Sequence, residues 1–272
     1  MYKRLLVAVD GSAFAESILP YALGICGATG SQLTLVRVVD AEGERAEASG
    51  YIDALAAELN AEGRCISAEG GVPAAILEEA ARVPGTLVVM TSQGRSGILG
   101  VVLGSVAMSV LRDGHGPVLV HRPHERFAGD RSQPIAIKRV VVPVDGTLGA
   151  EGIGESAGEA ARWLRAELVV VTVLSPDAGA AADIRSGDIL QSSSVRPLAL
   201  ALGKQYGVEA SWEVLHGDEP EQAIADYVGN DRGTMLAMTT RANTAPISAA
   251  LLGSVTTGCL RKAGVPILIY LP

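Results

Sequence analysis

The chain has 272 residues, of which 48% are hydrophobic and 4% aromatic, and its mean hydropathy is +0.30. This composition predicts a well-packed globular protein with an aliphatic core and excludes a disordered chain. A formal charge of −8, without a run of lysine or arginine, argues against nucleic-acid binding and against docking on a membrane surface.

No segment of the sequence indicates a membrane anchor or an exported protein. The apolar stretches, such as Leu168–Leu174, are strand-length and fall short of the roughly 20 residues that a membrane helix needs. The amino-terminal segment enters a strand pattern directly and lacks the apolar core of a signal peptide. Cys26, Cys65 and Cys259 are odd in number and widely spaced, so neither a disulfide framework nor a zinc site is expected. We therefore expect a cytoplasmic protein with reduced thiols and no metal or redox cofactor of its own.

The first half of the chain alternates between aliphatic strands and amphipathic helices. The expected strands are residues 5–10, 33–40, 64–69, 85–90 and 117–122. The first expected helix has Ser12 as its N-cap and a kink at Pro20. The second has Ile52, Leu55, Ala56 and Leu59 on one apolar face, and the third begins at Pro73. The fourth runs from Ser105 to Arg112. Such alternation predicts a parallel sheet covered by helices on both faces.

The second half of the chain repeats the first. KRLLVAVDGS at 3–12 returns as KRVVVPVDGT at 138–147, and VLGSV at 102–106 returns as LLGSV at 251–255. Three further matches lie in the same order, which identifies a duplication. We therefore expect an α/β fold made of two tandem copies of a doubly wound, five-stranded parallel-sheet domain of the Rossmann-like type. The copies span residues 1–124 and 138–272, and a polar linker at 125–137 joins them.

In a doubly wound sheet, ligands bind in the crevice at the carboxyl ends of the strands. The segment Asp10–Ser12 ends the first strand of the first copy, Val38 lies near the end of the second, and a glycine loop at 91–104 follows the fourth. Asp10 can accept hydrogen bonds from ribose hydroxyls, and Val38 can flank a base. The loop and the amino end of the helix at Ser105 offer N–H groups and a positive dipole end to phosphates. The three segments together predict a nucleotide site without a covalent nucleophile.

Each part of this site also has a purely structural interpretation. Asp10 and Ser105 could cap helices, and Gly94 and Gly97 could be turn residues with positive φ. Neither G-x-x-x-x-G-K-[ST] nor G-x-G-x-x-G follows the first strand. Taken alone, the loop is therefore better explained as a connection between a strand and a helix.

The loop Thr91-x2-Gly94-x9-Gly104-Ser105 resembles the G-x2-G-x9-G-[S/T] signature of the universal stress protein family. The opening LLVAVDGS and the G-x-x-P segment at 70–73 also look like that family, and the resemblance covers both copies. ATP-binding members of the family hold the nucleotide in the crevice described above. The resemblance therefore implies a stress-response regulator that binds ATP, ADP or AMP, with or without magnesium, and acts through its conformation or its partners.

By position, the resemblance also implies which residues contact the nucleotide in the first copy. They are Asp10, Gly11, Ser12, Val38, Met90, Thr91, Gly94, Arg95, Gly104, Ser105 and Val106. Thr91 replaces the first glycine of the signature, where its β-branched side chain either hinders a close approach or adds a hydroxyl.

The second copy departs further from the signature, so nucleotide binding is less expected there. Its candidate residues are Asp145, Val173, Thr240, Asn243, Gly253 and Ser254. Thr240 and Asn243 stand at the signature glycines, and Pro246 removes one N–H donor from the loop.

Two other functions stay open at this point. The same fold could serve as an interaction scaffold that binds no nucleotide, which Thr91 and the altered second loop favour. Slow ATP hydrolysis is conceivable, but no carboxylate pair with a lysine and a metal-binding serine is evident, so we expect no catalytic residues and no enzyme.

The last strand of each copy would form a hydrophobic sheet edge, which is a liability unless it is paired. We expect the two copies to pair these edges within the chain, as members of the family do when they dimerise. Whether the resulting unit forms a homodimer stays open.

Overall fold

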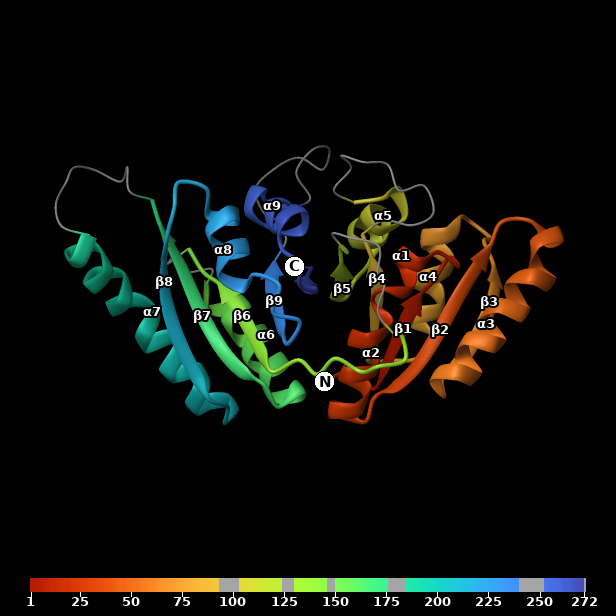
Figure 1. Ribbon diagram of the computed structural model, residues 1–272, viewed down its shortest axis with the longest axis horizontal. Coiled ribbons are helices and arrows are strands. Elements are labelled where there is room, and N and C mark those ends of the chain that lie inside the picture. The colour runs from red at the N-terminus through yellow and green to blue at the C-terminus, as the bar shows by residue number, and fades with distance from the viewer. Residues whose placement is uncertain (93–102, 124–129, 146–149, 176–183, 240–251, 272) are drawn as a thin grey trace. The chain divides into compact units, whose positions relative to one another are not determined.

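The computed structural model describes residues 1–92, 103–123, 130–145, 150–175, 184–239 and 252–271 (Figure 1). The chain divides into two compact units, Met1–Ala136 and Ile137–Tyr270, which we call domain 1 and domain 2. Each is an α/β domain built on a parallel sheet, so the predicted fold class is confirmed. The division between the units falls at the carboxyl end of the segment expected as a linker.

Domain 1 orders its strands β3-β2-β1-β4-β5, and the neighbouring strands run parallel. The strands are β1 (Arg4–Ala8), β2 (Gln32–Val39), β3 (Glu62–Ser67), β4 (Thr86–Thr91) and β5 (Val118–His121). The helical segments are α1 (Ala13–Glu16), α2 (Leu19–Thr29), η1 (Glu42–Glu44), α3 (Arg45–Leu59), α4 (Val72–Ala81) and α5 (Ser105–Asp113). The strand order reverses between β1 and β4, which is where a doubly wound sheet opens a crevice.

Domain 2 has the same order, β10-β9-β6-β7-β8, again with parallel neighbours. Its strands are β6 (Arg139–Pro143), β7 (Glu167–Leu174), β8 (Ala210–His216), β9 (Thr234–Thr239) and β10 (Ile267–Tyr270). Its helices are α6 (Ala150–Leu164), α7 (Ile184–Tyr206), α8 (Pro220–Val228) and α9 (Ser254–Lys262). The duplication seen in the sequence is therefore a duplication of topology.

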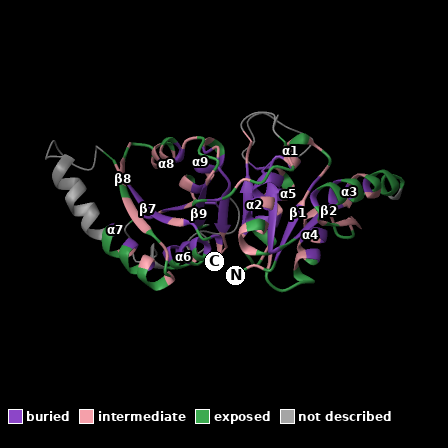
Figure 2. Ribbon diagram, turned by 60° about the horizontal axis from the view of Figure 1, so that its bottom comes forward, coloured by how far each residue is buried: buried purple, intermediate pink, exposed green. Residues whose placement is uncertain are grey.

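The central strands are buried on both faces, which explains their unbroken aliphatic sequence. Leu5, Leu6 and Val7 of β1 and the run Val140–Val142 of β6 are fully buried. Figure 2 shows the central strands mostly in the buried class and exposed residues on the helices, whereas the edge strand β8 is mostly of intermediate burial. Right-handed crossovers place α2 and α3 on one face of the domain 1 sheet and α4 and α5 on the other. The packing of α4 against α5, and of α8 against α9 in domain 2, agrees with this arrangement.

Pro20 does not kink a continuous helix, as its position in the sequence predicts. The chain instead forms two helices, and Pro20 lies in the first turn of α2. Residues in the first turn of a helix donate no hydrogen bond within it, so the absence of an N–H on proline costs nothing there. Ser12 caps α1 as expected, because its Oγ accepts a hydrogen bond from the Ala15 N–H at 3.1 Å. Ser17, after the end of α1, donates its hydroxyl to the Phe14 carbonyl at 2.7 Å.

Part of the expected linker packs on domain 1. Nε and Nη2 of Arg131 donate to the two carboxylate oxygens of Glu58 at 3.1 and 2.7 Å. Nη1 of Arg131 donates to Glu16 at 2.6 Å, and the Tyr51 hydroxyl donates to the other oxygen of Glu16 at 2.8 Å. The bonds from Arg131 hold the pKa of the Glu58 carboxyl below its ordinary value. We call residues 130–136 the connector.

The connector also contacts α2 through its backbone. The Ile135 N–H donates to the Pro20 carbonyl at 2.8 Å. Gly24 lies beneath it, and a Cβ atom at that position would come within 1.8 Å of the Ile135 carbonyl oxygen. The connector therefore depends on a glycine in the helix that it crosses.

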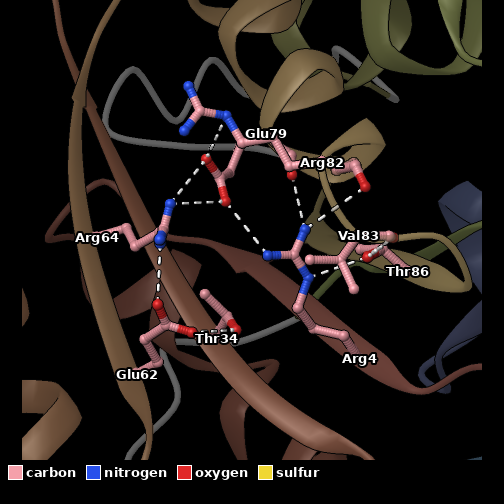
Figure 3. A network of polar contacts seen from close by, with 9 residues as sticks. Arg4, Thr34, Glu62, Arg64, Glu79, Arg82, Val83 and Thr86 are labelled. Atoms are coloured by element: carbon pink, nitrogen blue, oxygen red, sulfur yellow. Dashed lines mark hydrogen bonds and ion pairs between the residues drawn. The ribbon is translucent and has the colours of Figure 1, made fainter.

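A buried charge cluster lies at the amino ends of β1 and β4, and Figure 3 shows its side chains. The Glu79 side chain on α4 is 1% exposed and forms ion pairs with Arg4 at 3.2 Å, Arg64 at 3.3 Å and Arg82 at 3.3 Å. Arg4 also donates to the Glu79 carbonyl at 2.6 Å and to the Thr86 hydroxyl at 2.9 Å. The cluster ties the start of β1 to α4 and to β4.

In domain 2, a different set of contacts holds the start of the first strand, β6. Nε of Arg139 donates to the Thr234 hydroxyl at 3.2 Å, as Arg4 does to Thr86. Seven positions before this threonine, where domain 1 has Glu79, domain 2 has Tyr227. The Arg139 guanidinium lies 5.5 Å from the centroid of the Tyr227 ring, a cation–π contact at the position where Arg4 meets Glu79, and it also forms an ion pair with Asp231 at 3.5 Å.

Candidate functional site

A pocket of about 300 Å³ lies at the carboxyl ends of β1, β2 and β4, at the point where the strand order reverses. Apolar side chains from three elements make up much of its wall, among them Val38 on β2, Val72 and Ile76 on α4, and Met90 on β4. Polar groups lie at one side of this apolar surface. An apolar cleft with a few convergent polar groups is typical of a small-molecule site.

Asp10 lies at the mouth of this pocket, in the turn that follows β1. Its Oδ1 accepts hydrogen bonds from the Ser12 N–H at 2.9 Å and from the Ser12 hydroxyl at 2.6 Å. Gly11 between them has φ +83°, a conformation that side chains disfavour. The turn fixes the orientation of the carboxylate.

The amino end of α5 closes the other side of the pocket. Gly104 is the N-cap and provides no side-chain cap, and Ser105 and Val106 begin the helix. Gly104, Ser105, Val106 and Ala107 all line the pocket. The first N–H groups of a helix have no partner within it, and they carry its positive dipole end. This end of the pocket therefore favours an anion.

Ser92 lies between these elements. Its backbone is held at both sides, because its N–H donates to the His121 carbonyl at 2.8 Å and its carbonyl accepts from the Gly104 N–H at 2.6 Å. The residue is fully buried and lines the pocket. Among the residues that the structure describes, its hydroxyl has no hydrogen-bond partner. A buried hydroxyl without a partner costs about 1–3 kcal/mol, so a ligand that bonds to it recovers free energy.

Most of the residues predicted for the first copy meet at this pocket. They are Asp10, Val38, Met90, Thr91, Gly104, Ser105 and Val106. Gly11 lines a smaller pocket next to it, and Ser12 caps α1. Gly94 and Arg95 lie outside the described residues.

Sequence reasoning missed Ser92 and the two α4 residues, Val72 and Ile76. The apolar spacing of α4 indicated a buried helix face, but only the crossover direction shows that the start of that face reaches the crevice. Ser92 follows Thr91 directly, and nothing in its sequence context marks its hydroxyl as unpaired.

Domain 2 has a pocket of about 470 Å³ at the corresponding place. Asp145, Val173, Gly253 and Ser254 line it, as predicted by position. Thr240 and Asn243 lie outside the described residues. Strand β9 ends at Thr239, which lines this pocket as Thr91 lines the first. Thr256 occupies the position of Ala107 and donates its hydroxyl to the Thr239 carbonyl at 3.0 Å.

Two thiols of the chain, Cys26 and Cys259, are not activated as nucleophiles. Burial raises the pKa of Cys26 to about 11, and that of Cys259 to about 12. Both are therefore protonated at neutral pH. Within the described ranges, no group of three or more histidine, cysteine, aspartate or glutamate side chains is placed to hold a metal. None of the described helices combines the length and the apolar composition needed to cross a bilayer.

Comparison of the sequence with known proteins identifies the family of the chain. The sequence model of the Universal stress protein family matches residues 1–122 and 136–270. A universal stress protein of Methanocaldococcus jannaschii is 28% identical over 139 residues, which cover 44% of this chain and 82% of the relative.

A solved structure shows the same fold over the whole chain. A universal stress protein from Archaeoglobus fulgidus is 19% identical, covers 100% of this chain and 99% of its own, and superposes with a TM-score of 0.65. Another universal stress protein, described in complex with cAMP, is 21% identical, covers 50% of this chain and 98% of its own, and has a TM-score of 0.40.

Proposed function

Because the chain belongs to the universal stress protein family, we propose that domain 1 binds an adenine nucleotide, namely ATP or the related ADP or AMP. The nucleotide lies in the pocket at the carboxyl ends of β1, β2 and β4. The protein acts as a cytoplasmic stress-response regulator, in which occupancy changes its conformation or its binding of partners, and it does not act as an enzyme.

The observation that carries this proposal is the meeting of three kinds of group in one pocket. The Asp10 carboxylate offers an acceptor for ribose hydroxyls, and the apolar wall around Val38 suits the faces of a base. The amino end of α5 suits phosphate, and the unpaired hydroxyl of Ser92 lies beside it. These groups come from segments far apart in the sequence, and a simple connection between β4 and α5 would need none of them.

Domain 2 is proposed as a weaker site for the same ligand. Asp145 and the Gly253-Ser254 pair keep their positions. Thr256, however, places a larger side chain where domain 1 has Ala107, and its hydroxyl already donates within the protein. Pro143 and Pro220 replace Ala8 and Val72 in the wall.

Titration calorimetry with ATP tests the proposal, with and without a chelator so that any need for magnesium is measured in the same series. Asp10→Asn keeps the acceptor for the Ser12 bonds but removes the charge, so ATP should bind about tenfold more weakly, the equivalent of roughly 1.4 kcal/mol. Asp145→Asn is the matched control in domain 2 and should leave the tighter site unchanged. Equal losses in both variants would contradict the assignment to domain 1.

The alternative, a scaffold that binds no nucleotide, makes a different prediction. Mass spectrometry of the denatured, freshly purified protein should detect ATP, ADP or AMP if the nucleotide proposal is right. A nucleotide-free extract, together with no heat of binding at millimolar ATP, would favour the scaffold.

The pairing of the last strands of the two copies within the chain, and any homodimer beyond it, stay predictions. Light scattering during size-exclusion chromatography gives the mass in solution and separates a monomer from a homodimer.

A further inference from the structure

A second pocket of domain 1 is distinct from the nucleotide pocket in its position and in its charge. It measures about 220 Å³ and is lined by Gly11, Arg37, Glu44, Glu47, Ala48 and Tyr51. Its lining residues come from the turn after β1, the end of β2 and the start of α3. Its lining brings together one arginine and two glutamates.

Arg37 reaches this pocket because of the pleat of β2. Residues at alternate positions of a strand face opposite sides of the sheet. Arg64, the register partner of Val36, faces α4, since it bonds to Glu79 there. Cys65, the register partner of Arg37, faces α3, since its thiol contacts the Arg45 carbonyl at 4.0 Å. The Arg37 side chain therefore lies on the α3 side of the sheet, whereas Val36 and Val38 face the nucleotide pocket. Arg37 also forms part of the lining of the nucleotide pocket, so it borders both pockets.

Arg37 is unusual because it is a buried cation without a counter-ion. The residue is 8% exposed, and within the described parts of the chain its guanidinium forms no hydrogen bond and no ion pair. Burying a charge without a partner is costly. At the same position of β7, domain 2 has Thr172, so the fold does not require an arginine there.

The other polar groups of the pocket differ in their availability. The Tyr51 hydroxyl is engaged, since it donates to Glu16 at 2.8 Å. Glu44 and Glu47 are exposed, and neither lies within ion-pair distance of Arg37. A ligand in this pocket therefore meets a cation at the sheet and two carboxylates on α3 and the turn before it.

We propose that this pocket binds a small zwitterion, whose carboxylate pairs with Arg37 and whose amine faces Glu44 and Glu47. The planar guanidinium matches a carboxylate with two parallel hydrogen bonds. A phosphate ester would also pair with Arg37, but it would bring a second negative charge toward two glutamates. The volume suits a molecule of amino-acid size. The pocket differs from the proposed nucleotide site in its other lining residues, although Arg37 borders both and Gly11 belongs to the turn that orients Asp10.

Amide chemical shifts from NMR, titrated with a series of small probes, test the proposal. Glycine, β-alanine and γ-aminobutyrate carry the carboxylate and the amine at increasing separation, while acetate and methylammonium carry one charge each. We expect the amides of Gly11, Arg37 and Tyr51 to shift in a saturable way. One member of the series should bind at least about tenfold more tightly than acetate, because its amine adds an attraction to the glutamates. Inorganic phosphate should bind more weakly than that member.

Two variants separate a binding role from a structural one. Arg37→Met keeps the apolar stem and removes the charge, and Arg37→Thr introduces the residue of domain 2. Both should abolish zwitterion binding while the unfolding temperature stays equal or rises. Glu47→Gln should bring the affinity of the zwitterion closer to that of acetate.

Three results would overturn the proposal. They are acetate binding as tightly as every zwitterion, saturation by none of the probes, or a large fall in the unfolding temperature of both Arg37 variants. The last result would mean that the arginine has a structural partner.

Discussion

Two buried serine hydroxyls in domain 1 differ in a way that relates stability to binding. Ser17 is 1% exposed and donates to the Phe14 carbonyl. Ser92 is fully buried, and within the described residues its hydroxyl has no partner. The first hydroxyl stabilises the folded chain, whereas the second costs free energy until something binds to it.

Alanine substitutions should separate these two roles. Ser17→Ala should destabilise domain 1 by about 1 kcal/mol, because it removes a buried hydrogen bond. Ser92→Ala should leave the free energy of unfolding unchanged or raise it, and should weaken ATP binding. Denaturant unfolding and calorimetry measure the two quantities. A Ser92→Ala variant that loses stability but binds ATP normally would show that the hydroxyl is structural.

At the scale of elements, α2 contains two glycines with opposite surroundings. A Cβ at Gly24 would come within 1.8 Å of the Ile135 carbonyl oxygen, whereas a Cβ at Gly27 would meet nothing within 4 Å. Glycine is the weaker helix former at both positions. The close approach of the connector therefore requires glycine at position 24, whereas no steric contact requires glycine at position 27.

This pair gives a matched test of the connector. Gly27→Ala should stabilise the protein by about 0.5–1 kcal/mol through helix propensity. Gly24→Ala should destabilise it by about 1–3 kcal/mol, because the backbone of the connector must move away. Thermal unfolding measures both changes, and proteolysis should cut the connector faster in the Gly24 variant only. If both substitutions stabilised the protein, the connector would not be packed on α2 in solution.

At the scale of the whole molecule, the two domains share a topology but differ in what secures their first strands. Domain 1 encloses Glu79 among arginines, while domain 2 places Arg139 over Tyr227. Removing one member of a buried ion pair leaves the other charge unpaired. A half-buried cation–π contact contributes less, and Arg139 keeps its ion pair with Asp231 when the Tyr227 ring is removed. The two domains should therefore respond very differently to mutation at these equivalent positions.

Glu79→Gln should lower the stability of domain 1 by roughly 3–5 kcal/mol. Tyr227→Leu should cost domain 2 only about 1 kcal/mol beyond the change in packing. Calorimetric scans should then show domain 1 unfolding at a lower temperature in the Glu79 variant, as a separate transition. A single unshifted transition for Glu79→Gln would show that the cluster contributes little.

The sequence predicted the family, the alternation of strands and helices and the place of the crevice, because each follows from a pattern that local residues repeat. Aliphatic runs mark buried strands, and the duplication confirms each of them a second time. Ser92 and Arg37 could not be identified as site residues in the same way. Both were identified because their side chains have no hydrogen-bond or ion-pair partner among the described residues of the folded structure. The spacing of residues along the sequence does not indicate whether such a partner is present. The break before α2 depends on local backbone bonds that a proline alone does not specify.

The packing of the connector also bears on how the chain arose. The repeated sequences begin at Lys3 and Lys138, so the inherited copies meet near residue 137. The peptide that precedes the second copy has become part of the first, through Arg131 and the backbone of Ile135. An ancestor with one domain that ended near residue 124 would have left Glu16 and Glu58 without this arginine. Domain 1 therefore contains a packed segment, the connector, that lies outside the repeated sequences.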